Sequence, residues 1–306
     1  MEKRQTCDLA GIWRFEIDKE DRGFAEHWEK RRLTQMITLP GCLQAQGYGD
    51  AISEDTPWVQ SLYDALWYQR GEYAYAQENG TKVPFLSQPP RHYTGKAWYQ
   101  KTIFVPEKSD GFVGRLTLEN TKWKTTLWID GECKGSIVSL CAPHVYETGA
   151  LSAGEHTVTL CIDNGWQLPY RPDGHGVSDA LGATWNGVAG AITLELFNRV
   201  WIERVWVNAQ LPKAAIQVHL KNETSHIQNC IVHVQDTVHT DISADVVCVL
   251  TQGSRICELT LNYPSDTLLW DEFDQGLQHL IVTLSYISNA LQGKMQSSIT
   301  QLPLQS

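Results

Sequence analysis

Apolar and polar positions alternate with a period of two over much of this chain. Side chains of a β-strand point to opposite faces in turn, so this period predicts strands with one buried face. In the first half, strands are predicted at 97–105, 113–119, 124–130 and 156–163. The third segment runs into Asp130-Gly131, a pair that favours a tight hairpin turn. Short alternating strands at this spacing predict an all-β sandwich.

The pattern changes near residue 200. Before it, the segments 40–95 and 163–190 are rich in Gly, Pro, Asn, Asp and aromatic residues, and loops of such length are usually functional. After it, strands are predicted in quick succession at 201–208, 213–221, 229–236, 244–251, 256–262 and 277–287. We therefore predict two domains, 1–200 and 201–306, the second resembling an immunoglobulin-like sandwich. Only residues 20–33 could hold a helical turn or two.

Composition and charge narrow the function. A formal net charge of −10 argues against a nucleic-acid partner, because phosphate binding needs clustered Lys and Arg. No run approaches the roughly 18 apolar residues of a membrane-spanning helix. The eight cysteines form no C-x-x-C pair, so we expect no metal and no cofactor, and we predict buried thiols rather than disulfides. Free thiols and the absence of a signal-peptide pattern favour the cytoplasm, while a periplasmic location stays open.

Seven short segments, in order over about 180 residues, resemble glycoside hydrolase family 2, the family of β-galactosidases and β-glucuronidases. They are Leu9-Ala10-Gly11-Ile12-Trp13-Arg14-Phe15, Leu39-Pro40-Gly41, Gly95-Lys96-Ala97-Trp98-Tyr99-Gln100-Lys101, Leu127-Trp128-Ile129-Asp130-Gly131, Pro143-His144-Val145-Tyr146-Glu147, Leu151 to Asn164, and Trp185-Asn186-Gly187-Val188-Ala189-Gly190. Leu269-Trp270-Asp271 and the strand after it are similar to that family's immunoglobulin-like domain.

The resemblance implies an all-β fold, with a galactose-binding-like jelly-roll sandwich followed by an immunoglobulin-like sandwich. In that family a TIM barrel carries two glutamates for retaining hydrolysis, and such a barrel takes roughly 250 residues. We do not expect it within these 306 residues. The Asn222-Glu223 pair is similar to the family's acid/base dipeptide, but its position after a predicted strand indicates a hairpin loop. The chain is thus predicted to be a non-catalytic region, inactive alone.

The loop 164–187 is the candidate sugar contact. Trp166 and Trp185 offer faces for stacking on a sugar ring, whereas Arg171 and Asn186 offer hydrogen bonds to hydroxyl groups. The resemblance implies that an acidic side chain just before the Trp-Asn-Gly element reaches the terminal sugar, and Asp179 lies nearest to that place. An Asp that orders the loop backbone is an equal alternative for Asp179.

The expected partners are a β-glycoside carbohydrate and the catalytic barrel of a parent enzyme that hydrolyses O-glycosyl bonds. A free-standing carbohydrate-binding module or lectin is the alternative function. A purely structural or adhesive protein is a third, and it would need an exposed apolar patch or an unpaired strand edge.

Overall fold

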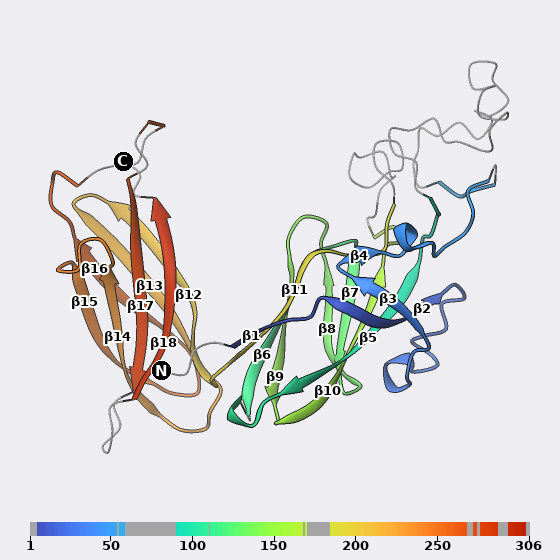
Figure 1. The fold of residues 1–306 in the computed structure, drawn as a ribbon. Coiled ribbons are helices and arrows are strands. Elements are labelled where there is room, and N and C mark those ends of the chain that lie inside the picture. The colour runs from blue at the N-terminus through green and yellow to red at the C-terminus, as the bar shows by residue number, and fades with distance from the viewer. Residues whose placement is uncertain are drawn as a thin grey trace. The chain divides into compact units, whose positions relative to one another are not determined.

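The structure is a computed structural model that describes residues 5–53, 55–58, 90–109, 111–167, 169, 184–267, 272–273, 276–286 and 293–303. The chain divides into two compact units, which we treat separately. The N-terminal unit comprises residues 6–110 and 114–195, and the C-terminal unit comprises 1–5, 111–113 and 196–306. Figure 1 shows that both are built from β-strands.

Two antiparallel sheets form the described part of the N-terminal unit. One has the order β1-β11-β6-β9, with β4 paired to β11, and the other has the order β3-β2-β5-β10-β7-β8. Their strands are β1 (Gln5–Asp8), β2 (Gly11–Asp18), β3 (Gln35–Leu39), β4 (Gly41–Cys42), β5 (Lys96–Val105), β6 (Phe112–Thr121), β7 (Lys124–Ile129), β8 (Glu132–Val138), β9 (His144–Leu151), β10 (Gly154–Asp163) and β11 (Gly187–Phe197). The strands predicted in this half are confirmed within two residues at each end.

The hairpin between β7 and β8 forms where Asp130-Gly131 predicted it. Both residues have positive φ, 51° and 80°, as the two central positions of a type I′ turn require. The Asp130 carboxylate accepts a hydrogen bond from the Thr157 backbone N–H and contacts Nδ1 of His156 at 2.6 Å. This links the turn to the start of β10.

Both faces of the six-stranded sheet carry apolar side chains. On one face Phe15 contacts Tyr99, with ring centroids 5.2 Å apart, and both rings are fully buried. On the other, the indoles of Trp98 and Trp128 stack at 5.0 Å. They form a small cluster with Trp28, Leu33 and Cys161. Trp28 and Leu33 belong to the segment between β2 and β3, so this segment covers the second face of the sheet. That segment contains a single 3-10 turn, Trp28–Lys30, where at most a turn or two of helix was predicted.

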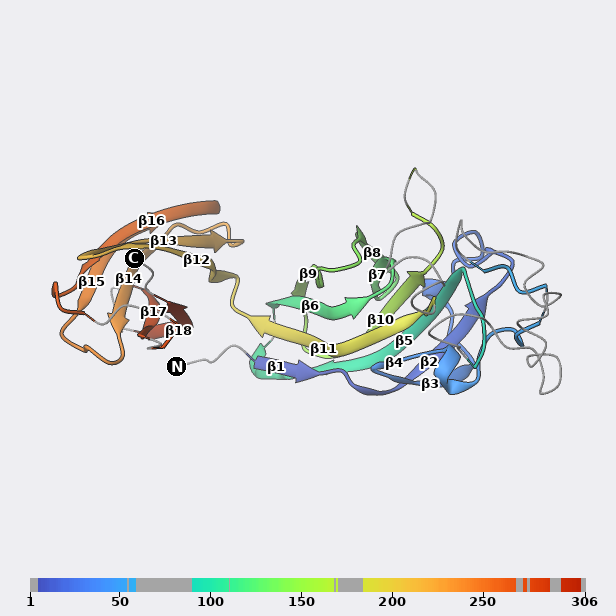
Figure 2. The same ribbon diagram turned by 90° about the horizontal axis from the view of Figure 1, so that it is seen from above.

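The C-terminal unit contains a three-stranded and a four-stranded sheet among its described residues, with orders β12-β13-β16 and β15-β14-β17-β18. Figure 2 shows them as two layers. Their strands are β12 (Val200–Gln210), β13 (Lys213–Asn222), β14 (Gln228–Asp236), β15 (Ser243–Leu250), β16 (Gly253–Asn262), β17 (Leu277–Tyr286) and β18 (Gly293–Pro303). Side chains from both sheets, such as Val218 and Val232, meet in one core.

The predicted all-β sandwich fold is confirmed, because the described residues form antiparallel sheets with only short 3-10 turns between them. Cys161, Cys230, Cys248 and Cys257 are buried thiols. No helix within the described ranges is long and apolar enough to cross a membrane.

Candidate functional site

The candidate site lies at one end of the N-terminal unit, where β10 ends and β5 and β11 begin. Asn186, directly before β11, is completely buried there. Its Oδ1 accepts a hydrogen bond from the Tyr99 hydroxyl at 2.7 Å, and its Nδ2 donates to the carbonyls of Gly95 at 3.0 Å and Ile162 at 2.9 Å. Burial raises the pKa of Tyr99 well above its ordinary value, so this phenol stays protonated and donates. Asn186 thus holds three strand ends together.

Gln44 and Asn164 extend this buried network to both long loops. The Gln44 Oε1 accepts from the Asn186 backbone N–H at 3.1 Å, and its Nε2 donates to the carbonyls of Tyr93 and Thr184. The Asn164 Nδ2 also donates to the Tyr93 carbonyl, at 2.9 Å. Since an unpaired buried polar group costs about 1–3 kcal/mol, the network fixes where each loop leaves the sandwich.

Gly187 explains why the Trp-Asn-Gly element ends in glycine. Its φ is +142°, and a Cβ at this position would lie 2.2 Å from the Gly41 carbonyl oxygen. Gly41 belongs to the Leu-Pro-Gly segment, and β4 pairs with β11 through Gly187 and Cys42. Two motifs that are far apart in sequence therefore meet backbone to backbone at this end.

The predicted sugar-contacting residues have different surroundings. Trp166 is partly exposed and packs edge-on against Trp123, with ring centroids 5.2 Å apart. Trp185 is also partly exposed, next to the buried Asn186. All side-chain polar atoms of Asn186 bind protein groups, which lets it position the loop ends, and the sugar contact expected of it stays a prediction. Arg171 and Asp179 lie outside the described residues.

Three carboxylates are buried among the described residues, and each takes part in local structure. Asp18 accepts hydrogen bonds from two backbone N–H groups of the following turn and from the Trp98 indole. Asp236 accepts from two backbone N–H groups of its own turn and from the Tyr263 hydroxyl. Glu29 contacts Nδ1 of the nearby His27 at 2.9 Å. These contacts order turns and do not form a reaction centre.

The Asn222-Glu223 pair has the loop position predicted for it. Asn222 is the last residue of β13, and its buried Nδ2 donates to the carbonyls of His226 and Leu250. Its Oδ1 accepts from the backbone N–H and hydroxyl of Thr224. The amide closes a turn, which gives this pair a structural role.

Sequence reasoning missed most of the buried network. Asn164 ends one of the seven recognised segments, and this was the available signal for it. Gln44 carried no signal, because its partners Tyr93 and Thr184 lie 49 and 140 residues away in sequence. Tyr99 lies in another of the seven segments, but no local pattern indicated its bond to Asn186.

Comparisons with known proteins agree with this arrangement. No family model matches the chain. A β-glucuronidase from Paenibacillus borealis is 25% identical over 170 residues, which cover 54% of this chain and 22% of that protein. A solved Bacteroides uniformis β-glucuronidase has a TM-score of 0.70 at 14% identity, covering 98% of this chain and 32% of the other. A family 2 β-galacturonidase from Eisenbergiella tayi has a TM-score of 0.62 at 13% identity, with 98% and 43% covered.

The chain spans about a fifth of the length of the curated relative and a third to a half of the solved structures. The likeness to the solved structures shows the fold, and the weaker sequence match points to the same enzymes. The resemblance predicted from the seven segments is therefore confirmed: this chain has the fold of the N-terminal region of glycoside hydrolase family 2 β-glucuronidases.

Proposed function

We propose that this chain is the non-catalytic N-terminal region of a retaining family 2 β-glycosidase. Residues 1–200 would form its galactose-binding-like jelly roll and residues 201–306 its immunoglobulin-like domain. The first domain binds carbohydrate at its loop end and supports a catalytic barrel. The similar solved structures are of β-glucuronidases and a β-galacturonidase, so we propose a β-linked uronoside as substrate of the parent enzyme.

The observation that carries this proposal is the buried network around Asn186. It joins the Leu-Pro-Gly, Trp-Tyr-x-Lys and Trp-Asn-Gly segments at one end of the sandwich. A fixed base of this kind holds the two described ends of the loop, 164–167 and 184–187, where Trp166 and Trp185 are partly exposed. Preorganised aromatic groups of this kind suit a sugar ring, since little freedom is lost on binding.

Calorimetry of the isolated chain with methyl β-D-glucuronide, methyl β-D-galacturonide and methyl β-D-glucoside tests the carbohydrate site. Trp185→Ala should weaken binding of a β-uronoside by about 1–2 kcal/mol, the range for a lost stacking contact. Trp206→Ala is the matched control, because Trp206 is 56% exposed in the C-terminal unit. Equal binding by both variants, or no binding to any glycoside, would contradict a carbohydrate site at the loop end.

A second measurement tests the non-catalytic role. Incubation with 4-nitrophenyl β-D-glucuronide and β-D-galactoside should release no nitrophenol. Turnover that disappears in a carboxylate-to-amide variant of this chain would contradict the proposal. Tight, selective glycan binding without any affinity for a family 2 barrel would favour the free-standing lectin.

A further inference from the structure

A groove with a basic lining lies on the outer face of the six-stranded sheet, within the N-terminal unit. Its volume is about 740 Å³. The floor comes from neighbouring strands: Arg14 on β2 is paired with Gln100 on β5, and Thr102 on β5 is paired with Thr157 on β10. The 3-10 turn and the two residues after it, Glu29 to Arg32, form the wall. The groove is therefore separate from the loop end: Thr102 is seven residues along β5 from Gly95, or roughly 23 Å.

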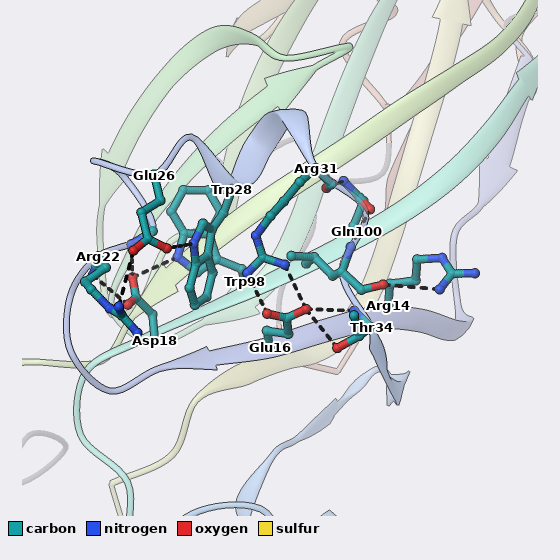
Figure 3. A network of polar contacts seen from close by, with 12 residues as sticks. Arg14, Glu16, Asp18, Arg22, Glu26, Trp28, Arg31, Thr34, Trp98 and Gln100 are labelled. Atoms are coloured by element: carbon teal, nitrogen blue, oxygen red, sulfur yellow. Dashed lines mark hydrogen bonds and ion pairs between the residues drawn. The ribbon is translucent and has the colours of Figure 1, made fainter.

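The wall is held firmly over the sheet. The Gln100 side chain donates to the Arg31 carbonyl at 3.0 Å and accepts from the Leu33 backbone N–H at 3.3 Å. Arg31 makes a two-point ion pair with Glu16, at 3.0 and 2.6 Å, and lies 4.2 Å from the centre of the Trp28 ring. Figure 3 shows Glu16 between Arg31 and Thr34, with Trp28 beside Trp98. The groove thus exists before any ligand binds.

The groove carries positive charge in a chain of net charge −10. On the face of Gln100 and Thr102, four cationic residues line it, Arg14, Lys30, Arg31 and Arg32, against two carboxylates, Glu29 and Asp130. Arg31 is neutralised by Glu16, and Asp130 contacts His156. Among the described residues, the other three cations have no carboxylate within ion-pair distance.

These cations are poised to receive an anion. Arg14 uses one of its nitrogens on the Leu33 carbonyl, which leaves further donors of its guanidinium for a ligand.

The remaining lining residues indicate which anion fits. Thr102 and Thr157 supply hydroxyl groups, and Ile12 and Met36 are 64% and 49% exposed at the side of the groove. Carboxylates pair with guanidinium groups, sugar hydroxyls bond to Thr side chains, and C–H faces of a sugar ring contact apolar groups. We propose that this groove is a second carbohydrate site that binds uronate-containing oligosaccharides.

This inference rests on the proposed function for its ligand class, and it adds a site on the sheet face. The two sites would act together if one acidic chain is held in the groove while its terminal sugar is processed elsewhere. A second contact of this kind raises the effective concentration of the substrate.

The test is calorimetric titration of the whole chain with a galacturonic acid trimer and with the fully methyl-esterified trimer, which has the same rings but no charge. The acid form should bind and the ester should bind at least tenfold more weakly. Arg32→Gln and Lys30→Gln should each weaken binding of the acid roughly tenfold, the effect of one lost charge-assisted contact. Lys108→Gln, an exposed lysine of the same unit outside the groove, should change nothing.

Equal affinity for acid and ester, or unchanged binding by Arg32→Gln and Lys30→Gln, would overturn the proposal that the groove binds uronate-containing oligosaccharides. Competition by a polyglutamate peptide as effective as the trimer would also overturn it, because it would indicate a site for acidic polypeptides. The monosaccharide titration of Trp185→Ala reports on the loop end alone. If Trp185→Ala weakens monosaccharide binding as expected but the trimer shows no preference for the acid form, the groove is not a carbohydrate site. The proposed function would then still stand.

Discussion

Asn186→Ala tests the buried network most directly. The change leaves the Tyr99 hydroxyl without its acceptor and removes a donor from the carbonyls of Gly95 and Ile162. The Gly95 carbonyl keeps the Asn164 backbone N–H at 3.3 Å, so its loss is smaller. At about 1–3 kcal/mol for each of the two main groups, the Tyr99 hydroxyl and the Ile162 carbonyl, the sum is about 2–6 kcal/mol. That is a large share of the roughly 5–15 kcal/mol that stabilise a typical domain.

Hydrogen exchange read by mass spectrometry, combined with urea unfolding, gives the assay. Exchange in Asn186→Ala should rise at the start of β5 and β11, while β13 of the C-terminal unit keeps its protection. Asn208→Ala, an exposed control on β12, should stay within about 0.5 kcal/mol of the parent protein.

A double-mutant cycle with Tyr99→Phe isolates the 2.7 Å bond between the two side chains. We expect a coupling energy of about 0.5–3 kcal/mol, the range for residues in direct contact. Zero coupling, or an Asn186→Ala variant as stable as the control, would refute the reasoning that this network holds the loop bases.

Three further predictions concern other parts of the molecule. Burial lowers the pKa of His156, but its hydrogen bonds to a carbonyl and a carboxylate outweigh this and raise it. Its stabilising effect should therefore be complete below the unfolded pKa of about 6.5 and disappear as pH rises through the folded value, and His156→Gln should flatten urea midpoints between pH 5 and 8. Gly187→Ala should lower the free energy of unfolding by more than about 2 kcal/mol, because the added Cβ clashes with the Gly41 backbone. Gly149→Ala is the control: its Cβ meets open space at φ +78°, so it should cost only about 1 kcal/mol. Thermal melting curves of both variants measure the difference. A thiol reagent should modify the exposed Cys133 in the folded protein but reach Cys257 only after unfolding, since a hydrogen bond with a neighbouring thiol and burial raise the pKa of Cys257; equal rates would contradict this.

The loop end and the groove use polar residues in different ways. At the loop end, amide groups are buried and fully paired, so they give rigidity, and the recognition proposed for this end falls to the partly exposed tryptophans beside them. In the groove, several cations keep donors for a ligand, while Gln100 and Arg31 maintain the wall. Rigid support under a partly exposed binding surface reduces the entropy lost on binding, and both places have it.

The sequence by itself determined the strands and their turns. A period of two placed β5 and β10 within two residues of their ends, and Asp130-Gly131 placed the hairpin, because both signals are local properties of the backbone. Ordered motifs were enough to identify the fold. Only the tertiary structure showed the buried partners of Asn186, for which the sequence predicted a sugar contact. It also showed that Gln44 reaches Asn186 from 142 residues away, and that Arg14 and Arg32 line the same groove. Burial and hydrogen-bond partners at these positions come from segments distant in the chain, so no local pattern encodes them.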